Sequence, residues 1–120
     1  MSYRGKALGA IAESWAATLL ERKKLRILKR NFRTRYGEID ILALDGKTLV
    51  IVEVKAKTSA VFGAAIEMIT PRKREKLILL ADELMIKYLT SNFRIDVVTV
   101  DDAEDQPVMK HYKGIIEFNG

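Results

Sequence analysis

Hydrophobic positions recur along the chain with a helical period in two segments and with a strand period in several others. From residue 6 to residue 24 the apolar side chains return every three or four positions, which predicts a helix. Its apolar stripe consists of Leu8, Ile11, Ala12, Trp15, Ala16, Leu19 and Leu20. The runs 37–44 and 47–57 are typical of strands, and Asp45-Gly46 between them predicts a two-residue hairpin loop.

A second helix is predicted to begin at Thr70-Pro71, because threonine can cap a helix N-terminus and proline suits the first helical position. Its core stripe consists of Leu77, Leu80, Ala81, Leu84 and Tyr88. Residues 25–33 predict an edge strand before the first hairpin, and residues 58–70 predict a loop with little regular structure.

The last third of the chain predicts a fourth strand over residues 93–100, with Arg94 and Asp96 on its outward face. An acidic loop follows, and residues 108–112 predict another edge strand. Taken in chain order, the elements are a helix, three strands, a helix and one or two strands. This order predicts a single α/β domain spanning residues 1–120.

Composition narrows the chemistry that such a domain can perform. The 120 residues are 48% hydrophobic and 31% charged, and 21 Lys and Arg against 16 Asp and Glu give a net charge of +5, which favours a polyanionic partner. With no Cys and one His, thiol nucleophiles, iron–sulfur clusters, cysteine zinc sites and His-rich metal sites are excluded. Any chemistry therefore uses carboxylates and lysines. Without a membrane-span-length apolar run or a signal-peptide core, we expect a cytoplasmic protein that has no membrane partner.

The hairpin brings together the most informative charged residues. Strand side chains alternate between faces, so Glu53 and Lys55 share one face of their strand. If Asp45-Gly46 is the loop, Asp40 lies on that same face, diagonal to Glu53 and about 7–8 Å from it at the backbone. The same pairing places Glu38 directly opposite Glu53. Two carboxylates at this spacing can share a divalent ion.

Two interpretations of this group stay open on spacing alone. In the first, Asp40 and Glu53 hold Mg²⁺ or Mn²⁺, and Lys55 orients or helps deprotonate a water, or neutralises a phosphate. In the second, Glu53 and Lys55 are a solvated pair at a strand end and Asp40 caps a turn. Because the pattern D…E-x-K is short and occurs by chance, spacing alone favours the second interpretation.

Basic residues surround this segment. Eight lie between residues 22 and 35, and the second helix opens with Arg72, Lys73, Arg74 and Lys76, where the helix dipole favours anions. A solvated basic face would account for the first group, whereas bases at a helix N-terminus fit a bound phosphate. The predicted nucleic-acid contacts are Arg30, Arg33, Arg35, Lys57, Arg72, Lys73 and Arg74. Tyr36 is the best candidate for stacking on a base, with core packing as the alternative.

The residues Gly37-Glu38-Ile39-Asp40 and Val52-Glu53-Val54-Lys55 resemble the motif of the PD-(D/E)xK nuclease superfamily, and more closely the YraN-like family of small bacterial proteins within it. The resemblance covers most of the chain. Its further matches are Arg4-Gly5, Gly9, Ala12-Glu13, Arg30-Asn31, Phe62-Gly63, Lys73 and Arg94 to Val98. The chain departs from the pattern at Ile39, where the superfamily nominally has proline, and at Lys57, where the family usually has arginine.

This resemblance implies a restriction endonuclease-like core: a mixed sheet with a three-strand antiparallel meander, a further strand after a crossover helix, and helices on both faces. It implies Asp40 and Glu53 as metal ligands, Lys55 as the catalytic lysine and Glu13 as the helix carboxylate that completes the site. The implied activity is that of an Mg²⁺- or Mn²⁺-dependent endonuclease on DNA, in preference to RNA, with branched DNA as the substrate. A homodimer and a protein partner stay open. The alternative function is a non-catalytic nucleic-acid-binding or partner-recruitment protein that keeps the nuclease fold.

Overall fold

The computed structural model describes residues 2–57, 69–101 and 108–119. The elements in chain order are α1 (Ser2–Arg22), β1 (Arg26–Thr34), β2 (Gly37–Asp45), β3 (Thr48–Lys57), α2 (Pro71–Lys87), β4 (Asn92–Asp101) and β5 (Val108–Asn119). The predicted helices and strands are therefore present, although β5 is longer than the sequence indicates. Most of the predicted loop 58–70 lies outside the described residues. No helix within the described ranges is long and apolar enough to cross a membrane.

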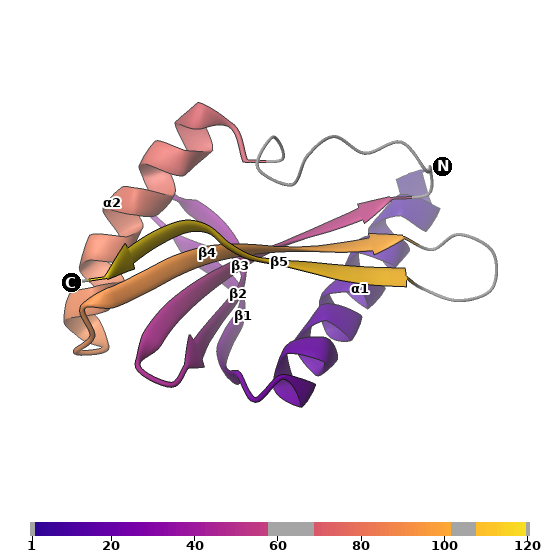
Figure 1. Cartoon of the computed structure of the whole chain (residues 1–120). Helices are drawn as coiled ribbons and strands as arrows, with labels where there is room; N and C mark the ends of the chain where they lie inside the picture. Colours follow the sequence, from indigo (N-terminus) through magenta and orange to yellow (C-terminus); the bar gives the residue numbers. More distant parts are fainter. Residues whose placement is uncertain (1, 58–68, 102–107, 120) are drawn as a thin grey trace.

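The five strands form one mixed sheet in the order β1-β2-β3-β4-β5. The first three strands are an antiparallel meander, β4 lies parallel to β3 after the crossover through α2, and β5 is antiparallel to β4. The helices α1 and α2 cover opposite faces of the sheet (Figure 1). This arrangement confirms the predicted fold class and is compatible with a restriction endonuclease-like core.

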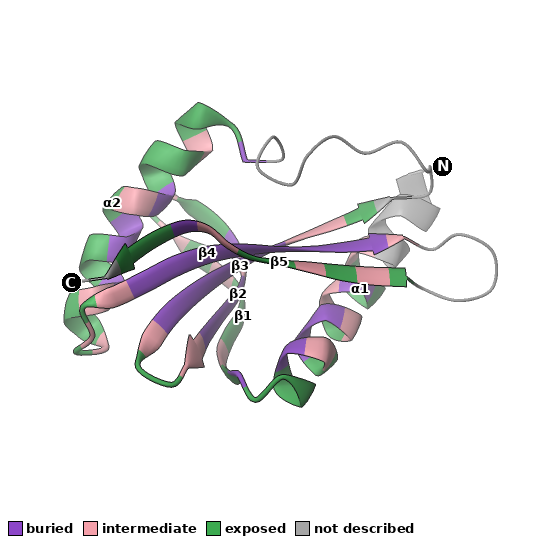
Figure 2. Ribbon diagram, viewed as in Figure 1, coloured by how far each residue is buried: buried purple, intermediate pink, exposed green. Residues whose placement is uncertain are grey.

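Each helix closes a separate hydrophobic core. The α2 face is filled by Leu77, Leu80 and Leu84 of that helix against apolar side chains from the strands. The α1 face is narrower and is filled by small residues such as Ala12 and Ala16, which let the helix approach the sheet closely. Both faces of β4 are consequently buried (Figure 2).

The prediction that Arg94 and Asp96 face outward is wrong, because α1 covers that face of β4. Arg94 is 5% exposed and Asp96 is fully buried. The Arg94 guanidinium donates to Asp96 Oδ1 at 3.0 Å and to Asp45 Oδ2 at 2.7 Å. His111 of β5 contacts Asp96 Oδ2 through Nε2 at 2.7 Å. We call Asp45, Arg94, Asp96 and His111 the buried network; it joins the first hairpin to β4 and β5.

The helix signals act as predicted at the start of α2. The Thr70 hydroxyl accepts a hydrogen bond from the backbone N–H of Lys73 at 3.2 Å, and Pro71 is the first helical residue. Four of the five stripe residues, Leu77 to Leu84, are buried. On α1 the prediction holds for Ala12, Ala16 and Leu20, but Ile11 is exposed. The α1 stripe is therefore narrower than its apolar pattern.

The hairpin register differs from the prediction by two residues. Asp45 pairs with Thr48, so the loop is Gly46-Lys47 instead of Asp45-Gly46. Gly46 has φ +60°, and a glycine with positive φ at the first loop position suits the twist of a two-residue hairpin. A shift of two residues keeps the parity, so Asp40 still lies near Glu53, as predicted, although the regular pairing of the two strands ends just before them at Ile41 and Val52. The predicted pairing of Glu38 with Glu53 is wrong.

Candidate metal and nucleic-acid site

The strands β2 and β3 separate at Asp40. Their pairing runs from Asp45 and Thr48 as far as Ile41 and Val52, whereas β3 stays paired with β4 up to its last residue. Beyond that point the Asp40 carboxylate accepts a hydrogen bond from the backbone N–H of Val54 at 2.8 Å. The Asp40 side chain thus accepts the hydrogen bond that the backbone of β2 would otherwise accept, and beyond it β3 is no longer paired with β2.

The backbone is also irregular in β1, across from Asp40. Arg30 pairs with Ile41 and Phe32 pairs with Ile39, so Asn31 lies opposite Asp40. Asn31 adopts the left-handed conformation with φ 50°, which asparagine tolerates better than most residues do. This irregular position in β1 therefore lies beside the point where the pairing of β2 with β3 ends.

Glu53 is the most deeply buried carboxylate of the site, with 1% of its surface exposed. Its Oε2 accepts a hydrogen bond from Lys73 Nζ at 2.9 Å. Its Oε1 is buried and has no hydrogen-bond partner among the described residues. Burial, and after it the charge of Asp40, raise the pKa of Glu53 above its ordinary value, against the opposing effects of Lys73 and Lys55. The buried carboxylate is therefore only partly compensated.

Asp40 lies between Glu53 and a third carboxylate, Glu13 of α1. Both Asp40 and Glu13 are half-buried. Burial raises the pKa of Glu13, and so do the charge and the side chain of Asp40, while Asn31 and Arg30 act in the opposite direction. The structure thus places Glu13 beside Asp40, as the predicted site requires, with Asp40 adjacent to both other carboxylates.

The three carboxylates do not form a closed cage. Within the described ranges, no group of three or more His, Cys, Asp or Glu side chains is arranged closely enough to hold a metal ion. Asp40 instead interacts with each of the other two, since its charge raises the pKa of Glu13 and that of Glu53. Hard oxygen donors and the unpartnered Oε1 of Glu53 nevertheless fit Mg²⁺ or Mn²⁺, because Mg²⁺ is usually held by one or two carboxylates and several waters.

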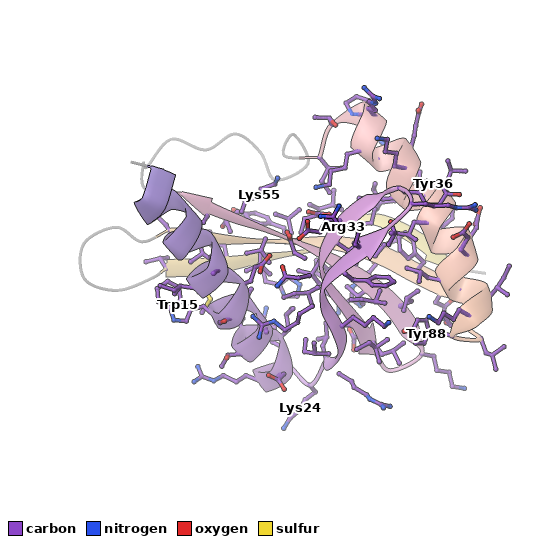
Figure 3. All side chains as sticks on the ribbon, turned by 180° about the vertical axis from the view of Figure 1, so that it is seen from behind. Trp15, Lys24, Arg33, Tyr36, Lys55 and Tyr88 are labelled. Atoms are coloured by element: carbon purple, nitrogen blue, oxygen red, sulfur yellow. The ribbon has the colours of Figure 1, made fainter. Side chains whose placement is uncertain are left out.

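Lys55 lies two residues beyond Glu53, on the same face of β3 by strand alternation. Figure 3 shows it on the outer half of that strand, and its side chain is half-buried. Its charge lowers the pKa of Glu53, so the ammonium acts on the carboxylate that the motif pairs it with. The structure therefore brings the four predicted catalytic residues, Glu13, Asp40, Glu53 and Lys55, to one region of the sheet.

Two cavities flank this region. The larger, of about 620 Å³, lies between the β1–β2 hairpin and the start of α2, and is lined by Tyr36, Arg72 and Lys73 among others. The smaller, of about 390 Å³, lies between α1 and the outer part of β3, and is lined by Glu13 and Val54 among others. The smaller cavity is thus lined by one of the three carboxylates, Glu13, and the larger one by Lys73, the hydrogen-bond partner of Glu53.

The predicted contacts on β1 and its turn lie at the surface. Arg30, Arg33 and Arg35 are all exposed. Arg33 lies 3.9 Å from the carboxylate of Glu38, and Arg35 pairs with Glu83 of α2. Exposed ion pairs of this kind are weak, so these guanidinium groups are free to exchange their partners for phosphate.

The remaining predicted contacts are divided between two environments. Arg72 and Arg74 are exposed at the start of α2, and Arg72 lines the larger cavity. Lys73 instead points inward and contacts Glu53. The sequence does not predict this contact, because the two residues are 20 positions apart and lie in different elements. Lys57 ends β3, and its side chain lies outside the described part of the structure.

Comparison with known proteins shows which family the chain belongs to. Residues 12–100 match the family model described as "Uncharacterised protein family UPF0102". A UPF0102 protein of Geobacter metallireducens is 40% identical over 120 residues, covering 98% of both chains. Similar proteins of Mycolicibacterium vanbaalenii and Pelotomaculum thermopropionicum are 39% and 46% identical, covering 90% and 79% of this chain and 92% and 81% of their own. The chain, with its acidic group inside the matched residues, therefore belongs to UPF0102, the YraN-like family that its sequence resembles.

Proposed function

We propose that this protein is a metal-dependent endonuclease that hydrolyses phosphodiester bonds in DNA with Mg²⁺ or Mn²⁺. The observation that carries the proposal is the buried Glu53 carboxylate, which has one oxygen without a hydrogen-bond partner among the described residues and lies beside Asp40. Burying a carboxylate is costly unless a cation compensates it. Carboxylates with raised pKa values beside an open cavity are also typical of functional sites.

Each residue has a distinct role in this proposal. Asp40 and Glu53 would hold the metal ion, and Glu13 would bind it directly or through water. A divalent ion bound there supplies a water of lowered pKa and neutralises charge on the phosphate. Lys55 orients the attacking water against the phosphorus and stabilises the negative charge that develops on the phosphoryl oxygens. As the water oxygen bonds to phosphorus, the bond from phosphorus to one sugar oxygen breaks. The water's proton passes to a neighbouring base or to solvent, and the leaving sugar oxygen takes up a proton from solvent.

The basic residues favour a nucleic acid as the substrate. Arg30 and Arg33 lie on β1, Arg35 lies in the turn that follows it, and Arg72 and Arg74 lie at the start of α2. Phosphate contacts of this kind read the backbone and depend strongly on salt. We propose DNA in preference to RNA and branched DNA in preference to linear duplex. Since a branched junction is itself symmetric, a homodimer would match it.

The test is cleavage of labelled linear, single-stranded, flapped and four-way DNA with Mg²⁺ or Mn²⁺. Wild type is compared with Glu53→Ala, and with Glu38→Ala as a control that removes an exposed carboxylate from the same hairpin. Cleavage by wild type and Glu38→Ala alone supports the proposal. Cleavage that persists in Glu53→Ala overturns it, because the metal ligand would then be elsewhere.

A second candidate function is a nucleic-acid-binding or partner-recruitment protein without activity. The observation that favours it is the open arrangement of the three carboxylates, together with a lysine already seated on Glu53. Under this proposal the protein binds DNA equally well with and without Mn²⁺. Binding without cleavage in both wild type and Glu53→Ala would favour it over the nuclease.

A further inference from the structure

Lys73 connects the acidic site with the larger cavity. Its Nζ donates to Glu53 Oε2 at 2.9 Å, while Lys73 itself is one of the residues that line the 620 Å³ cavity. Its side chain is 35% exposed, whereas that of Glu53 is 2% exposed. The ammonium thus stands at the border between a buried carboxylate and an open, basic cavity.

A divalent ion on Glu53 changes what Lys73 can do. Two cations that share one carboxylate repel each other, and the repulsion is strong where water is largely excluded. Lysine has a flexible four-carbon stem, so its ammonium can move while the backbone of α2 stays in place. The contact between Lys73 and Glu53 and a bound metal ion are therefore competitors for the same carboxylate.

The cavity offers Lys73 a second position. Arg72 and Lys76 line it as well, so three basic residues on the first turns of α2 face one space. The helix N-terminus adds a favourable field for anions there. A phosphate group of a nucleic acid in this cavity would take Lys73 as a partner and relieve its repulsion from the metal ion.

We propose that Lys73 exchanges between Glu53 and a substrate phosphate, and that this exchange makes metal binding and nucleic-acid binding cooperative. The inference rests on the proposed function and adds a regulation of the same site. Each ligand would tighten the other by the same factor, because coupling between binding sites is reciprocal. The metal would then be held firmly only when a substrate is present. Lys73 is a positioning residue in this scheme, because it acts through Glu53.

The test is a calorimetric titration with Mn²⁺, with and without a flapped DNA oligonucleotide. The proteins carry Lys55→Met so that the DNA stays intact. We expect DNA to tighten Mn²⁺ binding by at least about fivefold, the lower end of typical couplings. In Lys73→Met, Mn²⁺ should already bind more tightly without DNA, and DNA should add little. Circular dichroism checks that the variant folds.

Two further variants separate the exchange from general charge effects. Lys76→Met removes a positive charge from the same cavity about one turn along α2, and should weaken DNA binding without changing Mn²⁺ affinity in the absence of DNA. Lys73→Arg keeps the charge and should keep part of the coupling. If Lys73→Met does not fold, Lys73→Gln, which also removes the charge but keeps a polar group beside Glu53, takes its place in the same titrations with the same expected result.

The outcomes distinguish the failure of each proposal. If Mn²⁺ and DNA both bind but independently, the coupling is overturned while the proposed nuclease stands. The same conclusion follows if Lys73→Met binds Mn²⁺ as weakly as the protein with Lys73, because Lys73 would then be a structural partner of Glu53. If neither Mn²⁺ nor DNA binds when Lys73 is intact, both proposals are overturned together.

Discussion

Two acidic groups lie on opposite faces of neighbouring strands and are compensated to very different degrees. Asp96, in the buried network, receives hydrogen bonds from Arg94 and from the backbone of Gly114, and also contacts His111. Burial alone would raise its pKa, but these contacts hold the pKa below its ordinary value. Glu53, one strand away, accepts a hydrogen bond from Lys73 as its one such partner among the described side chains, and its pKa is raised.

We expect this difference to separate a structural group from the proposed functional one. In the buried network each charge stabilises its neighbour, and the pKa of Arg94 is raised because its bonds to Asp96 and Asp45 outweigh burial, which lowers it. In the acidic site the carboxylates Glu13, Asp40 and Glu53 destabilise one another. Proteins retain electrostatically unfavourable groups of this kind mainly where the groups serve binding or catalysis. Glu53 is therefore a better candidate for a functional residue than Asp96.

The largest effect is expected from breaking the buried network. Asp96→Asn leaves the buried Arg94 with Asp45 but without its fully buried carboxylate partner, and loss of one member of a buried ion pair typically costs about 3–5 kcal/mol of unfolding free energy. Urea denaturation of the variant and wild type measures this. A change below about 1 kcal/mol, the size of an exposed pair, would mean that the network is not a structural unit.

The matched substitution on the other face should behave oppositely. Glu53→Gln has the same shape, removes a buried charge, and leaves Lys73 with a route to solvent. We expect the unfolding free energy to stay within about 1 kcal/mol of wild type or to increase. Cleavage should be lost. A destabilisation as large as that of Asp96→Asn would contradict the comparison.

The pH dependence of stability should also separate the two groups. A carboxyl with a raised pKa, such as Glu53, contributes stability below its ordinary value of 4.5, and this is lost as the pH rises through its folded value. Asp96, whose pKa is lowered, contributes stability above 3.8 that is lost as the pH falls through its folded value. Glu53→Gln should therefore reduce the loss of stability with rising pH above 4.5. Urea midpoints measured between pH 3 and 8 test the signs.

The smallest effect on stability is expected at the surface. Arg33→Gln and Arg35→Gln remove exposed ion pairs and should leave the urea midpoint unchanged. Each should instead reduce the slope of log K for DNA binding against log salt by about 1. Unchanged slopes in both variants would mean that Arg33 and Arg35 do not contact the nucleic acid.

The sequence predicted the elements because their signals are local. Thr70-Pro71 begins α2, the apolar stripes identify both helices, and the parity of the first hairpin places Asp40 on the side of Glu53. The exact register could not be predicted, because a loop of Asp45-Gly46 and a loop of Gly46-Lys47 are both compatible with the sequence. The structure has the second, with Gly46 at the first loop position.

The missed features all depend on tertiary contacts. Arg94 and Asp96 were predicted to face outward, because the sequence of β4 does not indicate that α1 covers their side of the strand. The separation of β2 from β3 occurs at Asp40, opposite the left-handed Asn31 of a different strand. The Lys73–Glu53 contact depends on where the crossover places the first turn of α2. The residues of the site could be predicted from the sequence, but the contacts that compensate their charges could not.

The most direct test of the central claim compares binding and cleavage in Lys55→Met and wild type on the same flapped DNA with Mn²⁺. The account predicts that the variant folds, binds Mn²⁺ and binds the DNA with an affinity within a few-fold of wild type, yet cleaves none of it in single-turnover conditions. Cleavage at the wild-type rate in Lys55→Met would contradict the assignment of this acidic group as a nuclease site.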